Sequence, residues 1–172
     1  MRNLLFALII SVMHLAAVFA YGPSNALANE GAGDGISEKP GFVASRTPHA
    51  YDVLYDRLKV AIKANGMGHI TTASATLGAK GAGIIIPGNR IVGVYNNIWA
   101  RRMLKASIQA GIEAPIRFYL TENADGSSTL SYKTPTHVFS PYFEEADADL
   151  RVMAAELDAV FQAIFDQTIT EE

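Results

Sequence analysis

The chain has 172 residues, with 14 Lys and Arg against 17 Asp and Glu, and it contains no cysteine. The lack of cysteine excludes thiol catalysis, iron–sulfur clusters and cysteine-based zinc sites. The slightly acidic balance argues against a general nucleic-acid-binding protein, whose phosphate contacts require a basic surface.

The first residues have the composition of a secretory signal peptide. Arg2 supplies the positive start, and the apolar stretch behind it is about 16 residues long, where a membrane span needs roughly 20. Small-residue cleavage sites end at Ala20 and Ala28, and the polar segment that follows favours Ala28. We therefore expect residues 1–28 to be a cleaved signal peptide and residues 29–40 to be a flexible tether. The mature protein is expected to be periplasmic or secreted, with no membrane attachment.

A single folded domain is predicted from residue 41 to residue 168, followed by a tail, 169–172. Its elements follow one another in the order β-α-β-β-β-α-β-β-α. In chain order they are a strand 42–46, a helix 48–64, strands 70–76, 83–86 and 90–95, a helix 98–109, strands 115–121 and 128–133, and a last helix with its apolar stripe at 150–165. Hairpins dominate this order, which predicts an α+β fold: a mainly antiparallel sheet with its helices packed on one face.

Local signals predict where several of these elements begin or end. Thr47 is the expected N-cap of the first helix, because Pro48 suits the first helical position. Pro87-Gly88 is a type II turn signal, which predicts that the strands on either side pair as a hairpin. Asn97 is the expected cap of the second helix.

The glycine-rich run Gly78–Gly83 does not match a phosphate-binding loop. It lacks the Gly-Lys-Ser/Thr ending, and a strand is predicted after it, so no helix N-terminus would meet a phosphate. The chain also has no Gly-x-Ser-x-Gly and no His-Glu-x-x-His motif. The common sequence signatures of catalysis are therefore missing.

The middle of the chain carries a set of segments that occur together in a known family. They are GAGIIIPGNR (81–90), IVGVYNN (91–97), the short helix IWARRML, GIEAPIRFYLTE (111–122) and SYKTP (131–135). In these segments, and from Gly41 to Phe165 overall, the chain resembles the bacterial and archaeal family called domain of unknown function 302. Ala114-Pro115 matches the family pattern, whereas Ile98 stands where members characteristically carry proline. The resemblance implies a fold of the TATA-binding-protein class, β-α-β(4)-α, often dimeric and without an assigned activity.

The function that we favour is a non-enzymatic exported module that binds a small anionic ligand or a partner protein. Asn amides and Arg guanidinium groups can fix an anion with directed hydrogen bonds. The candidate binding residues are Asn96, Asn97, Arg101, Arg117 and Tyr119. Strand alternation directs Arg117 away from the core, where it would contact an anion or a second copy of the chain. The alternative is that these residues form no site: Asn97 would then be a helix cap, Asn96 a turn residue, and the arginines solvated surface charges.

Two alternatives remain open. The first is a hydrolase or isomerase with His137 as acid/base, although no nucleophile or carboxylate stands at a recognisable spacing. The second is a metal or haem carrier that uses His69, His137 and Met67. No two histidines are spaced to share a helix face, so we expect no resident metal or cofactor.

Overall fold

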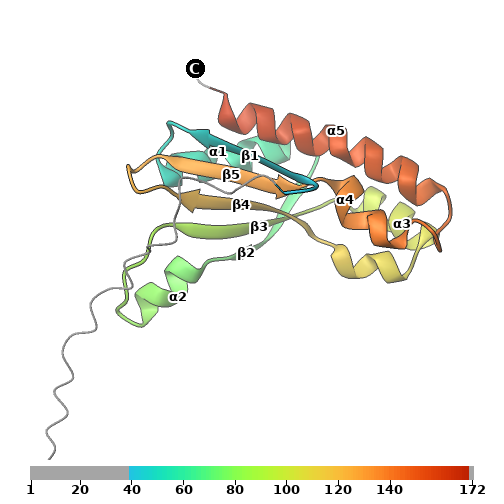
Figure 1. Ribbon diagram of the computed structural model, residues 1–172, viewed down its shortest axis with the longest axis horizontal. Coiled ribbons are helices and arrows are strands. Elements are labelled where there is room, and N and C mark those ends of the chain that lie inside the picture. The colour runs from blue at the N-terminus through green and yellow to red at the C-terminus, as the bar shows by residue number, and fades with distance from the viewer. Residues whose placement is uncertain (1–38, 171–172) are drawn as a thin grey trace, which may run out of the picture.

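The computed structural model describes residues 39–170 (Figure 1). The predicted signal peptide, its cleavage sites at Ala20 and Ala28, and residues 29–38 of the tether lie outside the described residues. Within residues 39–170, no helix has the length and apolar character needed to cross a membrane.

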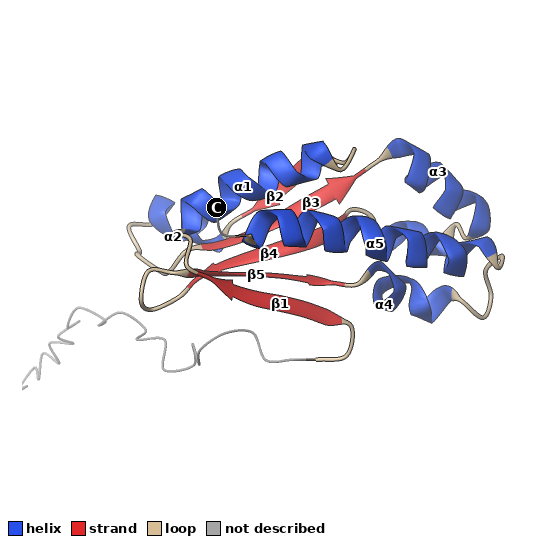
Figure 2. Cartoon of the chain, turned by 90° about the horizontal axis from the view of Figure 1, so that it is seen from above, coloured by secondary structure: helices blue, strands red, loops and turns tan. Residues whose placement is uncertain are grey.

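Five strands form one antiparallel sheet in the order β1-β5-β4-β3-β2. They are β1 (Phe42–Thr47), β2 (Gly68–Ala73), β3 (Asn89–Tyr95), β4 (Ile116–Glu122) and β5 (Ser128–Lys133). Two long helices, α1 (Tyr51–Ala64) and α5 (Asp149–Ile169), lie side by side over one face of the sheet (Figures 1 and 2). Strands and long helices thus follow the order β-α-β-β-β-β-α, which confirms the expected α+β fold.

Alternation along β4 determines which face the long helices cover. Ile116, Phe118 and Leu120 are buried, while Arg117 between them is exposed. Phe118 stacks on Phe161 of α5, with the ring centroids 5.0 Å apart. Both side chains are fully buried, and burial of one such side chain contributes about 1.5–3 kcal/mol, so this contact holds α5 against the sheet.

Three short helices connect or follow the strands. They are α2 (Ala75–Gly81), α3 (Asn97–Ala106) and α4 (Pro135–Phe139), with the 3-10 turns η1 (Gln109–Glu113) and η2 (Ser140–Tyr142). α3 and α4 pack against α5 at one end of the sheet, whereas α2 lies at the other end, beside β3 (Figure 1).

The predicted strand at 83–86 and its hairpin with β3 are wrong, because β3 pairs with β2 instead. The Ser74 side chain caps α2 by accepting the N–H of Leu77 at 3.2 Å. The chain then runs as coil to β3, and Ile85 is 94% exposed. The glycine-rich run forms the end of α2 and this coil. No helix begins directly after this run, so the structure agrees that it is not a phosphate-binding loop.

The first long helix begins at Tyr51, so the prediction of Thr47 as its N-cap is wrong. Thr47 is the last residue of β1, and its buried hydroxyl donates to the carbonyl of Ser128 at 3.1 Å. Because the sheet uses this hydroxyl, it does not cap the helix. Pro48 lies in the connection, and Ala50 takes the N-cap position without a side-chain hydrogen bond.

Candidate functional site

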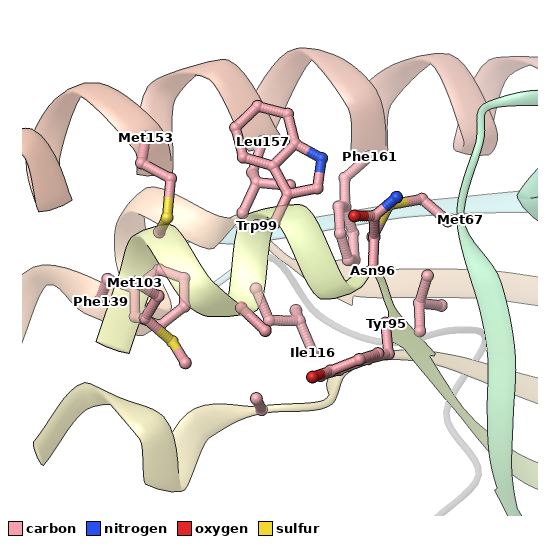
Figure 3. A pocket seen from close by; sticks show the side chains of 13 residues that line it. Met67, Tyr95, Asn96, Trp99, Met103, Ile116, Phe139, Met153, Leu157 and Phe161 are labelled. Atoms are coloured by element: carbon pink, nitrogen blue, oxygen red, sulfur yellow. The ribbon is translucent and has the colours of Figure 1, made fainter. Parts of the chain in front are cut away.

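A cavity of about 30 Å³ lies beneath α3, and we call it the α3 pocket (Figure 3). α3 forms one wall with Trp99, Ala100 and Met103, and α5 forms the opposite wall. The ends of β3 and β4 close the pocket on the side of the sheet, together with Phe139 of α4. The pocket therefore sits where five elements meet at one end of the domain.

The side chains that meet in this pocket come from distant parts of the sequence. Met67, Met103 and Met153 are the methionines of the described residues, and all three line it. Trp99, the single tryptophan of the chain, lies over the same cavity (Figure 3). Thioether side chains are flexible and polarisable, so such walls adapt to apolar groups of irregular shape. This grouping was not predicted from the sequence, although the rarity of Trp and Met was a visible signal.

The lining of the α3 pocket contains no charged side chain. Its polar atoms belong to Asn96, Tyr95 and Trp99. Within residues 39–170, no hydrogen bond engages the Tyr95 hydroxyl or the Trp99 indole N–H. The surface that the pocket presents to a ligand is nearly all apolar, and it offers no countercharge.

Asn96, rather than Asn97, caps α3. The Asn96 side-chain oxygen accepts the N–H of Ile98 at 2.8 Å, and its amide nitrogen donates to the carbonyl of Gly66 at 2.8 Å. Asn97 is the first residue of the helix and is exposed. The prediction of Asn97 as the cap is thus wrong by one residue, because α3 begins at Asn97 and not at the expected Ile98.

The two neighbouring arginines of α3 have different surroundings. Arg102 binds Asp149 of α5 through two hydrogen bonds, from Nε to Oδ2 at 2.7 Å and from Nη2 to Oδ1 at 2.6 Å. Its Nη1 donates to Glu156, also of α5. These contacts hold the pKa of the Asp149 carboxyl below its usual value. Arg101 remains exposed, as predicted.

The structure does not bring the predicted binding residues together into one site. Asn96, Asn97 and Arg101 lie at α3, whereas Arg117 and Tyr119 lie on the face of β4 opposite the helix-covered core. The Tyr119 hydroxyl accepts a hydrogen bond from the amide of Asn89, and Arg117 is exposed.

The histidines considered as ligands or as an acid/base also lie apart. His69 is on the edge strand β2, and its Nε2 lies 2.6 Å from the Thr72 hydroxyl. His137 is in α4 at the opposite edge, packed so closely on Gly41 that a Cβ there would lie 2.0 Å from its ring. Within residues 39–170, no group of three or more His, Asp or Glu side chains is placed to hold a metal ion.

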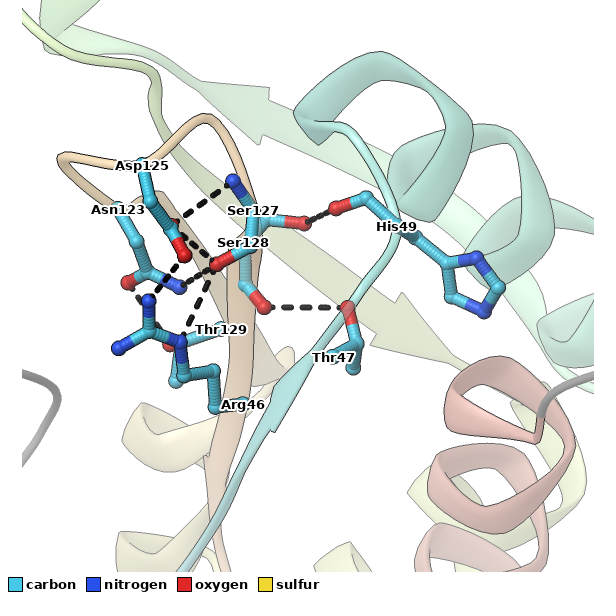
Figure 4. A network of polar contacts seen from close by, with 8 residues as sticks. All are labelled: Arg46, Thr47, His49, Asn123, Asp125, Ser127, Ser128 and Thr129. Atoms are coloured by element: carbon cyan, nitrogen blue, oxygen red, sulfur yellow. Dashed lines mark hydrogen bonds and ion pairs between the residues drawn. The ribbon is translucent and has the colours of Figure 1, made fainter.

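A polar cluster joins β1 to the turn between β4 and β5 (Figure 4). Arg46 pairs with Asp125 at 2.5 Å, and Asp125 also accepts the hydroxyl of Ser127 at 2.6 Å. Hydrogen bonds from Ser127, together with Arg46, lower the pKa of Asp125 to about 2. Asn123 continues the network, donating to the Ser127 hydroxyl and accepting from Thr129. Since these groups satisfy one another, the cluster stabilises the turn.

The side chain of Arg90 lies against two tyrosine rings between α1 and β3. The guanidinium of Arg90 lies 5.2 Å from the ring centroid of Tyr51 and 3.9 Å from that of Tyr55. Its Nε and Nη1 atoms are buried without a hydrogen-bond partner, as is the Tyr51 hydroxyl. Burial raises the pKa of Tyr51. Gly88 makes room for this packing, since a Cβ there would lie 2.8 Å from the Tyr51 ring.

Fold and pocket together define a class: an α+β domain with an antiparallel five-stranded sheet, two covering helices and an apolar pocket at one end. The chain belongs to the family described as "Domain of unknown function DUF302", whose sequence model matches residues 43–167. It is also similar to the crystal structure of an uncharacterized conserved DUF302 protein from Bacillus stearothermophilus. The TM-score is 0.66 at 19% identity, over 75% of this chain and 98% of that one. None of the curated proteins matches the chain.

Proposed function

We propose that this protein is a non-enzymatic binding module whose α3 pocket takes a small, neutral, largely apolar ligand or the apolar end of a larger one. One observation carries the proposal. Met67, Met103, Met153 and Trp99 converge from separate segments on one cavity that no charged side chain lines. Ligand sites in proteins are concave and mostly apolar, with a few polar groups that fix orientation.

The size of the α3 pocket bounds the ligand. A buried water needs about 10–15 Å³ of such volume, so a cavity of about 30 Å³ accepts a group of roughly two or three heavy atoms. Rotation of the methionine side chains enlarges this space without moving the backbone. The ligand is thus a short aliphatic compound or an alkyl group, and one with more than three heavy atoms enters only when these side chains rotate.

The chemistry of the lining favours a neutral compound over an anion. A carboxylate would lose its hydration on entering, and no cation of the lining would compensate for that loss. A carbonyl or ether oxygen costs much less to bury than a carboxylate. We therefore propose that the small ligand binds in the α3 pocket and not at the arginines predicted from the sequence.

A titration followed by methionine-methyl NMR and by Trp99 fluorescence tests this proposal. We expect 2-butanone to shift the methyl signals of Met67, Met103 and Met153 and to change the fluorescence of Trp99. Propionate, a charged compound of similar size, should shift none of them. Equal responses to both compounds, or no response to either, would contradict the proposal.

A filling substitution supplies the matched control. Ala100 lies in α3, lines the pocket and is buried, so Ala100→Leu should occupy the space and abolish the response to 2-butanone. Ala155 is exposed on α5, and Ala155→Leu should leave the response unchanged. Circular dichroism establishes that both variants are folded. A full response in Ala100→Leu would place the ligand elsewhere.

The open face of the sheet supports a second candidate, an interface with another copy of the chain. Arg117 is exposed there beside the half-buried Tyr119, and Ile91 of the neighbouring strand is 38% exposed. Arginine and aromatic side chains are enriched at interfaces. Sedimentation of wild type and Arg117→Ala over a concentration series should show weaker association in the variant. If both are monomers, Arg117 is a solvated surface charge.

We further propose that the protein is exported, on the basis of the composition of residues 1–28. The mass of the protein recovered from the periplasmic fraction should correspond to a chain that starts at Asn29. A full-length mass in the membrane pellet would contradict export by a cleaved signal.

A further inference from the structure

α3 has a weaker hydrophobic attachment than α5, the opposite wall of the pocket. Of its ten residues, Ala100 and Met103 are buried, and Trp99 and Ala106 are partly buried against the core, whereas α5 buries residues along its whole length. Ile98 is 67% exposed, so the outer side of α3 contributes nothing to the core. Elements with few buried apolar contacts open locally at low free energy, while the rest of the fold stays intact.

α3 is attached to the rest of the domain at both of its ends. Asn96 and Ser107, which flank the helix, have extended backbone conformations with φ of −146° and −157°. The side chain of Asn96 is tied to Gly66, and the carbonyl of Ala106 accepts the N–H of Asp147 at 3.1 Å. The helix is therefore held at its two ends, and its middle needs a separate attachment.

Arg102 supplies this attachment between the two ends. Its guanidinium binds Asp149 in a bidentate manner and also contacts Glu156, so it joins α3 directly to α5. The same guanidinium lies 5.8 Å from the ring centroid of Trp99, which lines the pocket. The Arg102 side chain thus connects α3 with α5 and also lies beside the Trp99 ring.

We propose that α3 is a lid over the α3 pocket and that Arg102 is the positioning residue that keeps the lid closed. Breaking its contacts with Asp149 and Glu156 frees the middle of α3, so that Trp99 and Met103 move away from α5 and open the cavity. The role of the lid in ligand entry rests on the proposed function, whereas its opening is a property of the protein alone and is tested without a ligand.

Amide hydrogen exchange of the full folded chain tests the lid, with adjacent arginines as a matched pair. Arg102→Gln removes the ion pairs and keeps much of the side chain, whereas Arg101→Gln removes an exposed charge of the same helix. We expect exchange in α3 to become about 5- to 30-fold faster in Arg102→Gln. Exchange in α1, α5 and the sheet should stay as in wild type. Arg101→Gln should have no effect on α3.

Two further measurements distinguish a lid from a general stabilising role. Arg102→Lys keeps the charge but cannot form the bidentate contact, so it should restore only part of the protection of α3. Adding Asp149→Asn to Arg102→Gln should change exchange little further, because both substitutions break the same contact. Acrylamide quenching of Trp99 should increase in Arg102→Gln and not in Arg101→Gln.

Two outcomes would overturn the proposal. One is equal α3 exchange in wild type and Arg102→Gln. The other is faster exchange throughout the fold with a lower melting temperature, because Arg102 would then be a general stabilising contact. If α3 opens as expected but 2-butanone shifts no methionine signal, the lid stands and the proposed ligand class fails. If 2-butanone binds, faster ligand exit in Arg102→Gln alone, measured from methyl line widths, supports the lid further.

Discussion

α2 and α3 are both short helices that connect neighbouring strands, but they are held in different ways. α3 buries Ala100 and Met103 against the core. α2 has no buried residue, and Leu77 at its centre is 60% exposed. Two hydroxyl groups attach α2 to the start of β3. Ser74 donates to the carbonyl of Asn89 at 2.7 Å, and Thr76 accepts the N–H of Asn89, also at 2.7 Å.

The difference shows which kind of helix a sequence pattern reveals. An amphipathic helix such as α3 carries its apolar residues at three- and four-residue spacing, and this spacing is visible without the structure. α2 depends on hydrogen bonds to a strand more than ten residues further along the chain. Its own residues, ATLGAKG, carry no apolar stripe.

Truncating the apolar residue at the centre of each helix should have very different effects. Met103→Ala should lower the free energy of unfolding by about 2–5 kcal/mol, because it leaves a void in the core. Leu77→Ala should stay within about 0.5 kcal/mol, because Leu77 is largely exposed. Denaturant unfolding measures both. Similar midpoints for the two variants would show that α3 is no better anchored than α2.

Removing the cap of α3 should have a smaller effect. Asn96→Ala loses the bond to the Ile98 N–H and the bond to the Gly66 carbonyl, so we expect a loss of about 1–2 kcal/mol. Asn97→Ala is the control, and its effect should stay within about 0.5 kcal/mol. A larger loss of thermal stability in Asn97→Ala than in Asn96→Ala would show that Asn97 is the cap.

Removing a hydroxyl that holds α2 should loosen α2 alone. Thr76→Val keeps the shape of the side chain but leaves the Asn89 N–H and the Pro87 carbonyl without their partner, at a cost of about 1 kcal/mol. We expect faster proteolytic cleavage within residues 75–88 and little change in the melting temperature. Thr72→Val on the neighbouring edge strand is the control. Unchanged cleavage would mean that other contacts hold α2.

Acid should loosen α3 but not α2. The pKa of Asp149 is lowered by its hydrogen bond with Arg102. The stabilisation is therefore complete above the unfolded pKa of about 4, and it is lost as the pH falls through the lower folded value. The hydroxyl contacts of α2 do not titrate in this range. Acrylamide quenching of Trp99 should rise below about pH 4 in wild type. In Arg102→Gln, where quenching is already high, this rise should be absent.

Much of the fold follows from patterns that lie within single elements. The alternation of Ile116, Phe118 and Leu120 specified β4 and its buried face, and the stripe from Leu150 to Phe165 specified α5. These predictions are confirmed because the pattern and the burial that it reflects belong to the same segment. The start of α1 and the fate of residues 83–86 were predicted wrongly. In both places the partner of a hydroxyl group, Ser128 for Thr47 and Asn89 for Ser74, lies far away in the sequence.

The candidate site divides in the same way. The family, the α+β class and the exposure of Arg101 and Arg117 were predicted from the residue sequence, because each depends on local residue order or on alternation. Only the tertiary structure placed Met67, Met103 and Met153 around one cavity beneath Trp99 and paired Arg102 with α5. No spacing rule relates residues that belong to different elements. Their meeting depends on how the sheet and its helices pack, so the apolar pocket and its covering helix come from the tertiary fold.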